Sequence, residues 1–305
     1  MASNKITGFA KTVNELLKGQ QYKIDYYQRE YNWQTKQIRE LVEDLSDRFM
    51  DAWEPGHSRT RVADYPFYFM GAVIISESGS DRFIVDGQQR LTTLTLLMIH
   101  LKHLAAEVDA DQAAVLSSLI MSKRYGDTAF NIADEDRNAV MQALNDGVEP
   151  DLTAASQSAT NLAARFRDLG AALPEELTTQ ALPYFIDWLL ERVQLVEINA
   201  PTDDDAYSIF ETMNDRGLKL KPAEMLKGYL LANIDRGKHR DRANTLWRDR
   251  IKKLADLDED GDADFLKTWL RSQYADSIRE RSKGAKPRDW DRIGTEFHRW
   301  LRGQA

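Results

Sequence analysis

The pattern of apolar and polar residues changes its period abruptly within residues 83–103. Residues 83–85 form a short β-favouring run, and Asp86 and Gly87 form a turn signal. After Gln88, apolar residues recur three or four positions apart, as on one face of a helix, at Leu91, Leu94, Leu97, Met98, Leu101 and Leu104. The pattern predicts a strand that passes through a tight turn directly into an amphipathic helix.

Shorter patterns predict the elements before this stretch. In chain order we expect an amphipathic helix (5–20), a strand (22–24), a helix (38–49) and a loop (53–66). Residues 65–76 form a continuous apolar, β-rich run, which is typical of a buried strand. A turn at residues 78–81 joins that run to residues 82–85. We therefore expect a hairpin whose second strand leads into the turn at Gly87.

The rest of the chain reads as mainly helical. We expect helices within 134–145, 153–170, 178–192, 203–216 and 222–234, and a strand at 194–199. Residues 236–253 are strongly basic and residues 256–264 are acidic. This change of composition places a domain boundary near residue 236.

Composition narrows the class of protein. The chain has 305 residues, 42% of them hydrophobic and 30% charged, which is typical of a globular protein of one or two domains. It has no cysteine, which excludes disulfides and thiolate metal sites, and no apolar run long enough to span a bilayer. We expect a soluble cytoplasmic protein that does not bind membranes. The net charge of −8 argues against DNA binding by the whole surface but leaves room for a local basic patch.

The turn at Gly87 has the chemistry of an anion site. The first N–H groups of a helix lack an intrahelical partner, and the helix dipole adds partial positive charge there. Gly87 would let a ligand approach the backbone, and Arg90 adds a permanently charged fork of donors. A phosphate fits such a site. The alternative is that Asp86 only caps the helix while Gln88, Gln89 and Arg90 lie in solvent.

Three stretches carry a family resemblance. Residues 86–94 read DGQQRLTTL, residues 22–45 read YKIDYYQREYNWQTKQIRELVEDL, and residues 209–231 read IFETMNDRGLKLKPAEMLKGYLL. They resemble, in the same order, the motifs of the N-terminal, S-like domain of GmrSD-type modification-dependent restriction proteins and their phage-defence relatives. The matching positions of the two outer motifs are Tyr27, Gln28, Arg29, Tyr31, Trp33, Asn214, Arg216 and Gly217.

This resemblance implies a fold and a domain organisation. The expected fold class is α+β, with a ParB/sulfiredoxin-like small sheet, the DGQQR strand–turn–helix and a largely helical remainder. We expect a nucleotide-binding domain over residues 1–235 with a helical insertion at about 105–192. Residues 236–305 would be a helical C-terminal segment, and whether it is a truncated link to a nuclease domain stays open.

The resemblance also implies a function. We expect an NTP-binding and NTP-hydrolysing regulatory domain, working with Mg²⁺, of a type IV-like DNA restriction and phage-defence system. Its partners would be a nucleotide, a His-Asn-His-type nuclease domain or subunit absent from this chain, and DNA through the full system. The preferred base, the general base, the sensing of modified DNA and homo-oligomerisation stay open.

The resemblance further assigns the site residues. Asp86, Gln89 and Arg90 would be catalytic, with Asp86 capping the helix or holding a divalent ion. The nucleotide-binding residues would be Gln28, Arg29, Gly87, Gln88, Gln89, Arg90, Asn214 and Arg216. We expect Gln28, Arg29, Asn214 and Arg216 to converge on the Gly87–Arg90 turn and to line one nucleotide-sized pocket with it. Clustered arginines repel one another unless an anion lies between them, so the pocket would hold an anion.

Other chemistries fit the sequence less well. Residues 256–267 have the acidic residues and the glycine of a calcium loop, but Lys267 stands where a bidentate Glu is required. His100 and His103 lack a third metal ligand fixed by spacing. Neither a P-loop nor a His-Asn-His nuclease motif is recognisable. An alternative from a different class is a non-hydrolysing DNA-binding adaptor with a ParB-like fold, docked through basic segments 236–253 and 279–302.

Overall fold

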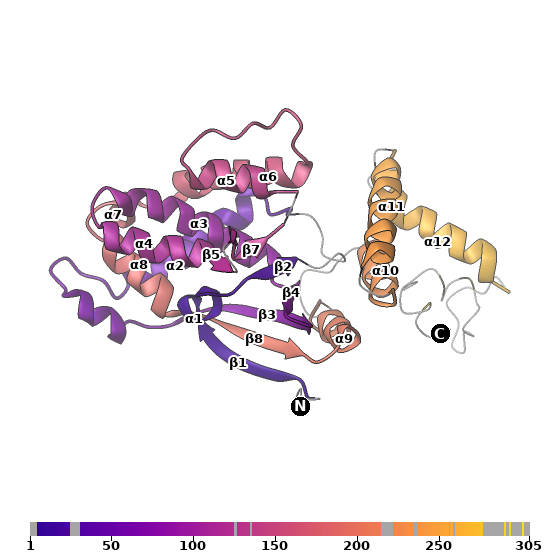
Figure 1. The fold of residues 1–305 in the computed structure, drawn as a ribbon, viewed down its shortest axis with the longest axis horizontal. Coiled ribbons are helices and arrows are strands. Elements are labelled where there is room, and N and C mark those ends of the chain that lie inside the picture. Colours follow the sequence, from indigo (N-terminus) through magenta and orange to yellow (C-terminus); the bar gives the residue numbers. More distant parts are fainter. Residues whose placement is uncertain are drawn as a thin grey trace. The chain divides into compact units, whose positions relative to one another are not determined.

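The structure is a computed structural model that describes most of the chain. The described residues are 5–24, 31–124, 127–134, 136–214, 222–234, 237–255, 257–258, 260–276, 290, 293 and 301. The described chain divides into two compact units, one extending to Thr202 and the other beginning at Asp203 (Figure 1). The first unit combines a mixed sheet with helices and the second is helical, so the fold class is α+β, as predicted.

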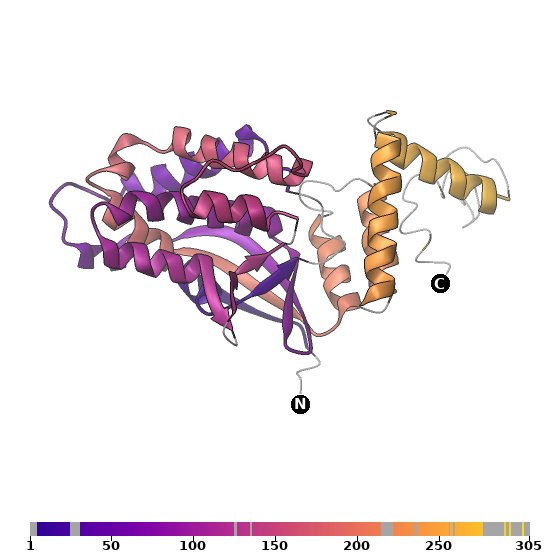
Figure 2. The ribbon, with the colours of Figure 1, turned by 45° about the horizontal axis from the view of Figure 1, so that its top comes forward.

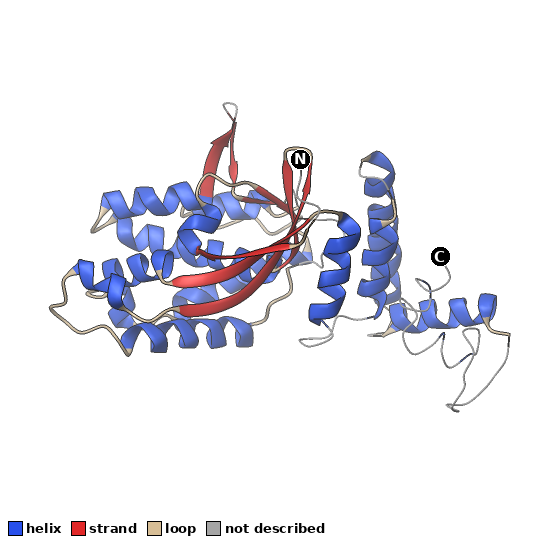
Figure 3. Cartoon of the chain, turned by 90° about the horizontal axis from the view of Figure 1, so that it is seen from below, coloured by secondary structure: helices blue, strands red, loops and turns tan. Residues whose placement is uncertain are grey.

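The first unit contains a mixed sheet of six described strands (Figure 3). They are β1 (Thr7–Thr12), β2 (Tyr22–Ile24), β3 (Tyr68–Ser78), β4 (Asp81–Asp86), β7 (Ile132–Ala133) and β8 (Val193–Ala200). Their order is β1-β8-β3-β4-β2-β7, and the pairs β1–β8 and β3–β4 are antiparallel. Two further strands, β5 (Met121–Arg124) and β6 (Asp127–Phe130), form a separate hairpin. The predicted hairpin of β3 and β4 is confirmed.

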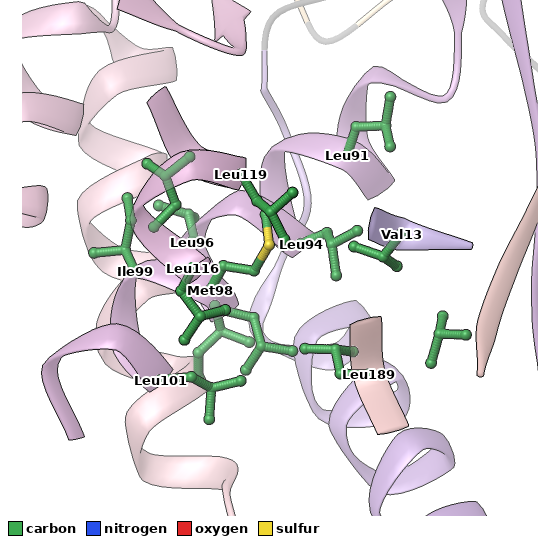
Figure 4. Packing of buried hydrophobic residues seen from close by; sticks show 14 of the residues in the cluster. Val13, Leu91, Leu94, Leu96, Met98, Ile99, Leu101, Leu116, Leu119 and Leu189 are labelled. Atoms are coloured by element: carbon green, nitrogen blue, oxygen red, sulfur yellow. The ribbon is translucent and has the colours of Figure 1, made fainter. Parts of the chain in front are cut away.

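Helices pack with this sheet around one hydrophobic core (Figure 2). They are α1 (Val13–Leu17), α2 (Thr35–Met50), η1 (3-10, Arg59–Asp64), α3 (Gln88–Ala106), α4 (Ala110–Ile120), α5 (Asn138–Asn145), α6 (Gln157–Ala172), α7 (Glu175–Thr178) and α8 (Leu182–Glu191). Helix α3 contacts α4, α6 and α8. The core joins side chains of α3 to side chains of α1, α4 and α8 (Figure 4).

Helix α3 is not amphipathic, which corrects the prediction from the leucine spacing. Its buried residues lie on every side of the helix and include Thr92, Thr93, Thr95 and Leu96 between the predicted core positions. The reason is that α3 is surrounded, with helices on several sides and sheet residues Val73 and Ile84 in the same core. Two of the three buried threonine hydroxyls are paired: Thr95 Oγ1 donates to the Leu91 carbonyl (2.9 Å), and Thr93 Oγ1 lies 2.8 Å from the Tyr31 hydroxyl. The buried Thr92 hydroxyl has no hydrogen-bond partner in the described part of the chain.

One local prediction was wrong, and one region contains strands that were not predicted. The helix expected over residues 5–20 is mostly strand, because residues 7–12 pair with β8 along its whole length and only Val13–Leu17 is helical. Thr12 makes the transition, since it caps α1 through a capping box with Glu15. The region between α4 and α5, within a part of the chain expected to be mainly helical, contains the strands β5, β6 and β7. These strands are too short to show a clear alternation of apolar and polar residues in the sequence.

The second unit is built from four described helices. They are α9 (Asp203–Asn214), α10 (Pro222–Ala232), α11 (Lys238–Ala255) and α12 (Gly261–Tyr274). Leu226 of α10 and Leu270 of α12 share a small core with Ile293, and Trp247 of α11 packs against it. The compact units divide at residue 203 rather than 236, because α9 and α10 group with the C-terminal helices. Compact units need not fold as independent domains, so the domain boundary at 236 stays a prediction. Among the described helices, none has both the length and the apolar character needed to cross a bilayer.

A buried ionic cluster joins three strands of the first unit. Glu197 of β8 is almost fully buried and pairs with Lys11 of β1 (2.8 Å) and Arg82 of β4 (2.9 Å). Arg82 also donates to the Tyr22 hydroxyl (3.0 Å), and that hydroxyl donates to the Leu16 carbonyl (2.8 Å). Burial alone would raise the pKa of Glu197, but the hydrogen bond from Lys11 and the charge of Arg82 hold that pKa below its ordinary value.

We expect Glu197→Gln to destabilise the fold in a pH-dependent way. At pH 7 the cost should be about 3 kcal/mol, because two partly buried cations lose their counter-charge. The stability that a depressed carboxyl pKa provides is present above the unfolded value of 4.5 and is lost as the pH falls through the folded value. The difference in urea unfolding free energy between wild type and variant should therefore shrink from pH 7 to pH 3. A difference independent of pH would contradict an ionised Glu197.

Candidate functional site

The DGQQR motif forms the junction of β4 and α3. Asp86 is the last residue of β4, Gly87 is the N-cap, and Gln88 begins α3. Gly87 has a left-handed backbone (φ 97°), and its carbonyl accepts from Leu91 N (3.0 Å). The strand–turn–helix predicted from the sequence is confirmed. Because the N-cap is a glycine, no side chain caps the helix, and the positive end of the dipole is not offset by a capping oxygen.

Gly87 is required by the packing of the sheet as well as by its backbone angle. A Cβ atom at this position would lie 2.6 Å from Val73 Cγ1 on the neighbouring strand β3. The side of Gly87 on which a side chain would project is thus occupied by the core. From the sequence, Gly87 was interpreted as a glycine that lets a ligand approach the backbone. The structure shows a different reason for glycine here, because a side chain would collide with Val73 in the core.

Asp86 and Arg90 form an ion pair across the first turn of α3. Arg90 Nη2 lies 3.2 Å from Asp86 Oδ2, and about a quarter of each side chain is exposed. Arg90 Nη1 donates to the Met70 carbonyl of β3 (3.3 Å), beside Gly71, which also has a left-handed backbone (φ 104°). A Cβ atom at Gly71 would overlap the Arg90 guanidinium. Asp86 therefore does not cap α3, which corrects the capping role, and instead orients Arg90.

Gln89 binds the segment that follows the Tyr27–Arg29 motif. Its Oε1 accepts from Asn32 N (2.9 Å) and from Trp33 N (3.1 Å). About one turn further along α3, Thr93 Oγ1 lies 2.8 Å from the Tyr31 hydroxyl. Burial raises the pKa of Tyr31 to about 12, so its hydroxyl stays protonated at neutral pH. The first two turns of α3 thus fix both the backbone and an aromatic side chain of residues 31–33.

Helix α6 holds the same segment from the other direction. Ser158 Oγ accepts from Tyr31 N (3.0 Å), and Asn161 Nδ2 donates to the Tyr31 carbonyl (3.1 Å). Arg165 Nη1 donates to the Trp33 carbonyl (3.2 Å). The backbone of residues 31–33 is therefore clamped between α3 and α6 by hydrogen bonds on both of its sides. We call this arrangement the α3–α6 clamp.

The structure places the predicted site residues unequally. Asp86, Gly87, Gln88, Gln89 and Arg90 share the β4–α3 junction, where Gln88 is almost fully buried. Gln28, Arg29 and Arg216 lie outside the described residues. Asn214 ends α9 in the second unit, and its side chain is also outside the description. The predicted convergence of the three motifs on one pocket stays a prediction.

The sequence interpretation missed the residues that α6 contributes to the clamp. Ser158, Asn161, Arg165 and Asp168 follow one another at intervals of three or four, as a polar stripe on an otherwise alanine-rich helix. Asp168 completes the stripe by pairing with Arg165 (2.6 Å) and accepting from Thr35 Oγ1 (2.9 Å). That periodicity was a signal for a polar contact, but it did not identify the partner some 130 positions earlier.

The two histidines of α3 pack against one aromatic ring. His100 and His103 both make edge-on contacts with the Phe166 ring. Burial lowers the pKa of His100, with a further contribution from His103. Among the described residues, no group of three or more acidic or histidine side chains could hold a metal ion.

The glycine requirement predicts a graded stability effect. Gly79, in the β3–β4 turn, has a left-handed backbone (φ 63°) with open space around it, so Gly79→Ala should cost about 1 kcal/mol. Gly87→Ala adds the contact with Val73 and should cost about 3 kcal/mol. Urea unfolding of the two variants measures the difference. Equal costs would show that the Val73 contact can relax.

The clamp predicts that position 89 needs an acceptor. Gln89→Ala should increase amide exchange at Asn32 and Trp33 at least tenfold, because it removes together two bonds that contribute about 1 kcal/mol each. Gln89→Glu keeps the acceptor and should preserve the protection of both amides. Exchange can be followed by mass spectrometry of peptides covering residues 31–35. Unchanged exchange in the alanine variant would contradict the clamp.

Comparisons with known proteins identify the family. No curated protein matches the sequence. Residues 13–231 match the family model described as the GmrSD restriction endonuclease, N-terminal domain. This range covers both the β4–α3 junction and the α3–α6 clamp, together with helices α9 and α10 up to Leu231. The chain therefore belongs to the family of GmrSD restriction endonuclease N-terminal domains.

Proposed function

We propose that this chain binds a nucleoside triphosphate with Mg²⁺, hydrolyses it, and thereby regulates a nuclease domain that the chain itself does not contain. Its family indicates a component of a restriction system. The proposal adds three properties to this family membership: nucleotide binding, nucleotide hydrolysis and control of a nuclease. DNA would be reached through the complete system.

The observation that carries the proposal is the environment of Arg90. Its guanidinium lies one turn into α3, at the positive end of the helix dipole, and is a quarter exposed. Both of its described hydrogen bonds are long, at 3.2 and 3.3 Å. A phosphate at this end of α3 would gain the dipole and a charge-assisted bond from Arg90, which together favour an anion.

Asp86 fits a role in holding Mg²⁺ beside such a phosphate. Magnesium is commonly held by one or two carboxylates together with phosphate oxygens and waters, rather than by a complete protein cage. Asp86, the last residue of β4, supplies one partly exposed carboxylate directly before the turn at Gly87. The ion would neutralise charge on the phosphates. Binding of Mg²⁺ by Asp86 would also release Arg90 to contact the phosphates.

The other motif residues receive roles that follow from their positions. Gln89 would act as a positioning residue, because its carbonyl oxygen already holds Asn32 and Trp33. The clamp would thereby fix the chain just after Gln28 and Arg29 relative to the turn. We assign Gln28 and Arg29, with Asn214 and Arg216, to the nucleotide on the family resemblance.

Arg90→Ala tests the proposal. With wild type, a nucleotide at 100 times its Kd with Mg²⁺ should raise the melting temperature by about 5–10 °C. The variant should lose this rise and release no phosphate from any of the four common NTPs. Arg90→Lys should recover part of the rise, because it restores the charge without the planar fork. Arg39→Ala, which removes an exposed arginine of α2, is the control and should behave as wild type.

The same measurements separate the proposal from the adaptor alternative. A non-hydrolysing DNA-binding adaptor would be stabilised by DNA and not by nucleotide with Mg²⁺. A normal nucleotide-induced rise in the Arg90→Ala variant, despite an unchanged melting temperature without ligand, would overturn the role of Arg90. Metal-dependent DNA cleavage that disappears on mutating a residue of this chain would overturn the view that the nuclease lies elsewhere.

A further inference from the structure

Helix α11 concentrates positive charge in a chain whose overall charge is negative. Residues 238–255 contain seven Lys and Arg and two Asp, a local balance of +5 in a chain of net charge −8. The helix lies beyond residue 231, where the family match ends, so the family assigns it no role. It is the long orange helix labelled α11 in Figure 1.

Five cations of α11 are exposed in the described structure, and four of them lie on one side of the helix, whereas the fifth, Arg248, lies about 80° outside that side. Lys238, Arg242, Arg250 and Lys253 are all exposed. At 100° per residue they fall within an arc of about 120°, and they extend over about 22 Å of helix. The exposed Leu246 and Asp249 lie in the same arc. We call this surface the basic face of α11.

The opposite side of α11 is committed to the core of its own unit. Trp247 packs against the cluster of Leu226, Leu270 and Ile293. Arg240, only 2% exposed, turns inward and donates from Nε to the Ile234 carbonyl (2.6 Å). The packing of these two residues fixes the rotation of the helix, so the basic face is held toward solvent.

We propose that the basic face of α11 contacts the phosphate backbone of duplex DNA. A row of exposed cations on a straight helix matches a surface of regularly spaced negative charge, and binding is favoured by counterion release. An anionic membrane is a poorer match, because a membrane-surface helix needs a broad exposed apolar side. Here the exposed apolar side chain within the arc is Leu246, since Trp247 is packed inward.

The contact is backbone-directed, so it carries affinity without sequence preference. Lysine and arginine bound to phosphates position a protein on the duplex and do not read the bases. The basic face would hold DNA for the restriction system while recognition occurs elsewhere. This inference does not depend on nucleotide binding by the β4–α3 junction.

The test measures the salt dependence of DNA binding. Anisotropy of a labelled, unmodified 20-base-pair duplex is recorded with the full chain, without nucleotide, at several NaCl concentrations. The variant replaces Lys238, Arg242, Arg250 and Lys253 by Ala. Because each lost phosphate contact changes the slope of log K against log salt by about 0.9, the slope should fall in magnitude by about 3–4. Affinity at low salt should fall at least tenfold.

A second variant controls for the change of net charge. It removes two lysines and two arginines that are exposed on the first unit, namely Lys5, Lys18, Arg39 and Arg61. Its slope should match wild type, and both variants should retain wild-type melting temperatures. Absence of duplex binding by wild type, equal losses in the two variants, or an unchanged slope in the α11 variant would each overturn the proposal. So would binding to phosphatidylserine vesicles in place of the duplex.

Discussion

The fold of the first unit depends on α3, both on the turn at which this helix begins and on the burial of the residues that follow. At Gly87, where α3 begins, the backbone passes so close to Val73 of the neighbouring strand that there is no space for a side chain between them. From there the helix enters a core in which residues 91–99 are all buried. A central helix of this kind stabilises the fold through its whole circumference, because each turn removes apolar surface from water in several directions.

Burial of α3 leaves its first turn as the place where polar chemistry can occur. Asp86 and Arg90 remain partly exposed there, while Gln88 and the threonines that follow are enclosed. The hydrogen bonds of Gln89 and Thr93 extend the influence of this turn to the aromatic segment of residues 31–33. Two motifs almost 60 positions apart in the sequence thus form one connected structure.

The sequence predicted the elements whose signals are local. The period change at Gly87, the β3–β4 hairpin and the regular spacing of α2 all correspond to observed elements. Predictions failed where long-range pairing decided the conformation. Residues 7–12 became a strand because β8, nearly 190 positions later, offers them hydrogen bonds, and α3 lost its amphipathic character because other elements surround it. In the candidate site, Arg90 and Gln89 were found from the motif, but their partners Met70 and Asn32 could not be found from spacing.

The α3–α6 clamp changes the meaning of the helical region between the motifs. From the sequence, that region was interpreted as a helical insertion at about residues 105–192. Ser158, Asn161 and Arg165 form hydrogen bonds with the backbone of residues 31–33, so α6 supports the first motif structurally. Shortening α6 would therefore loosen a segment that lies some 130 positions earlier in the sequence.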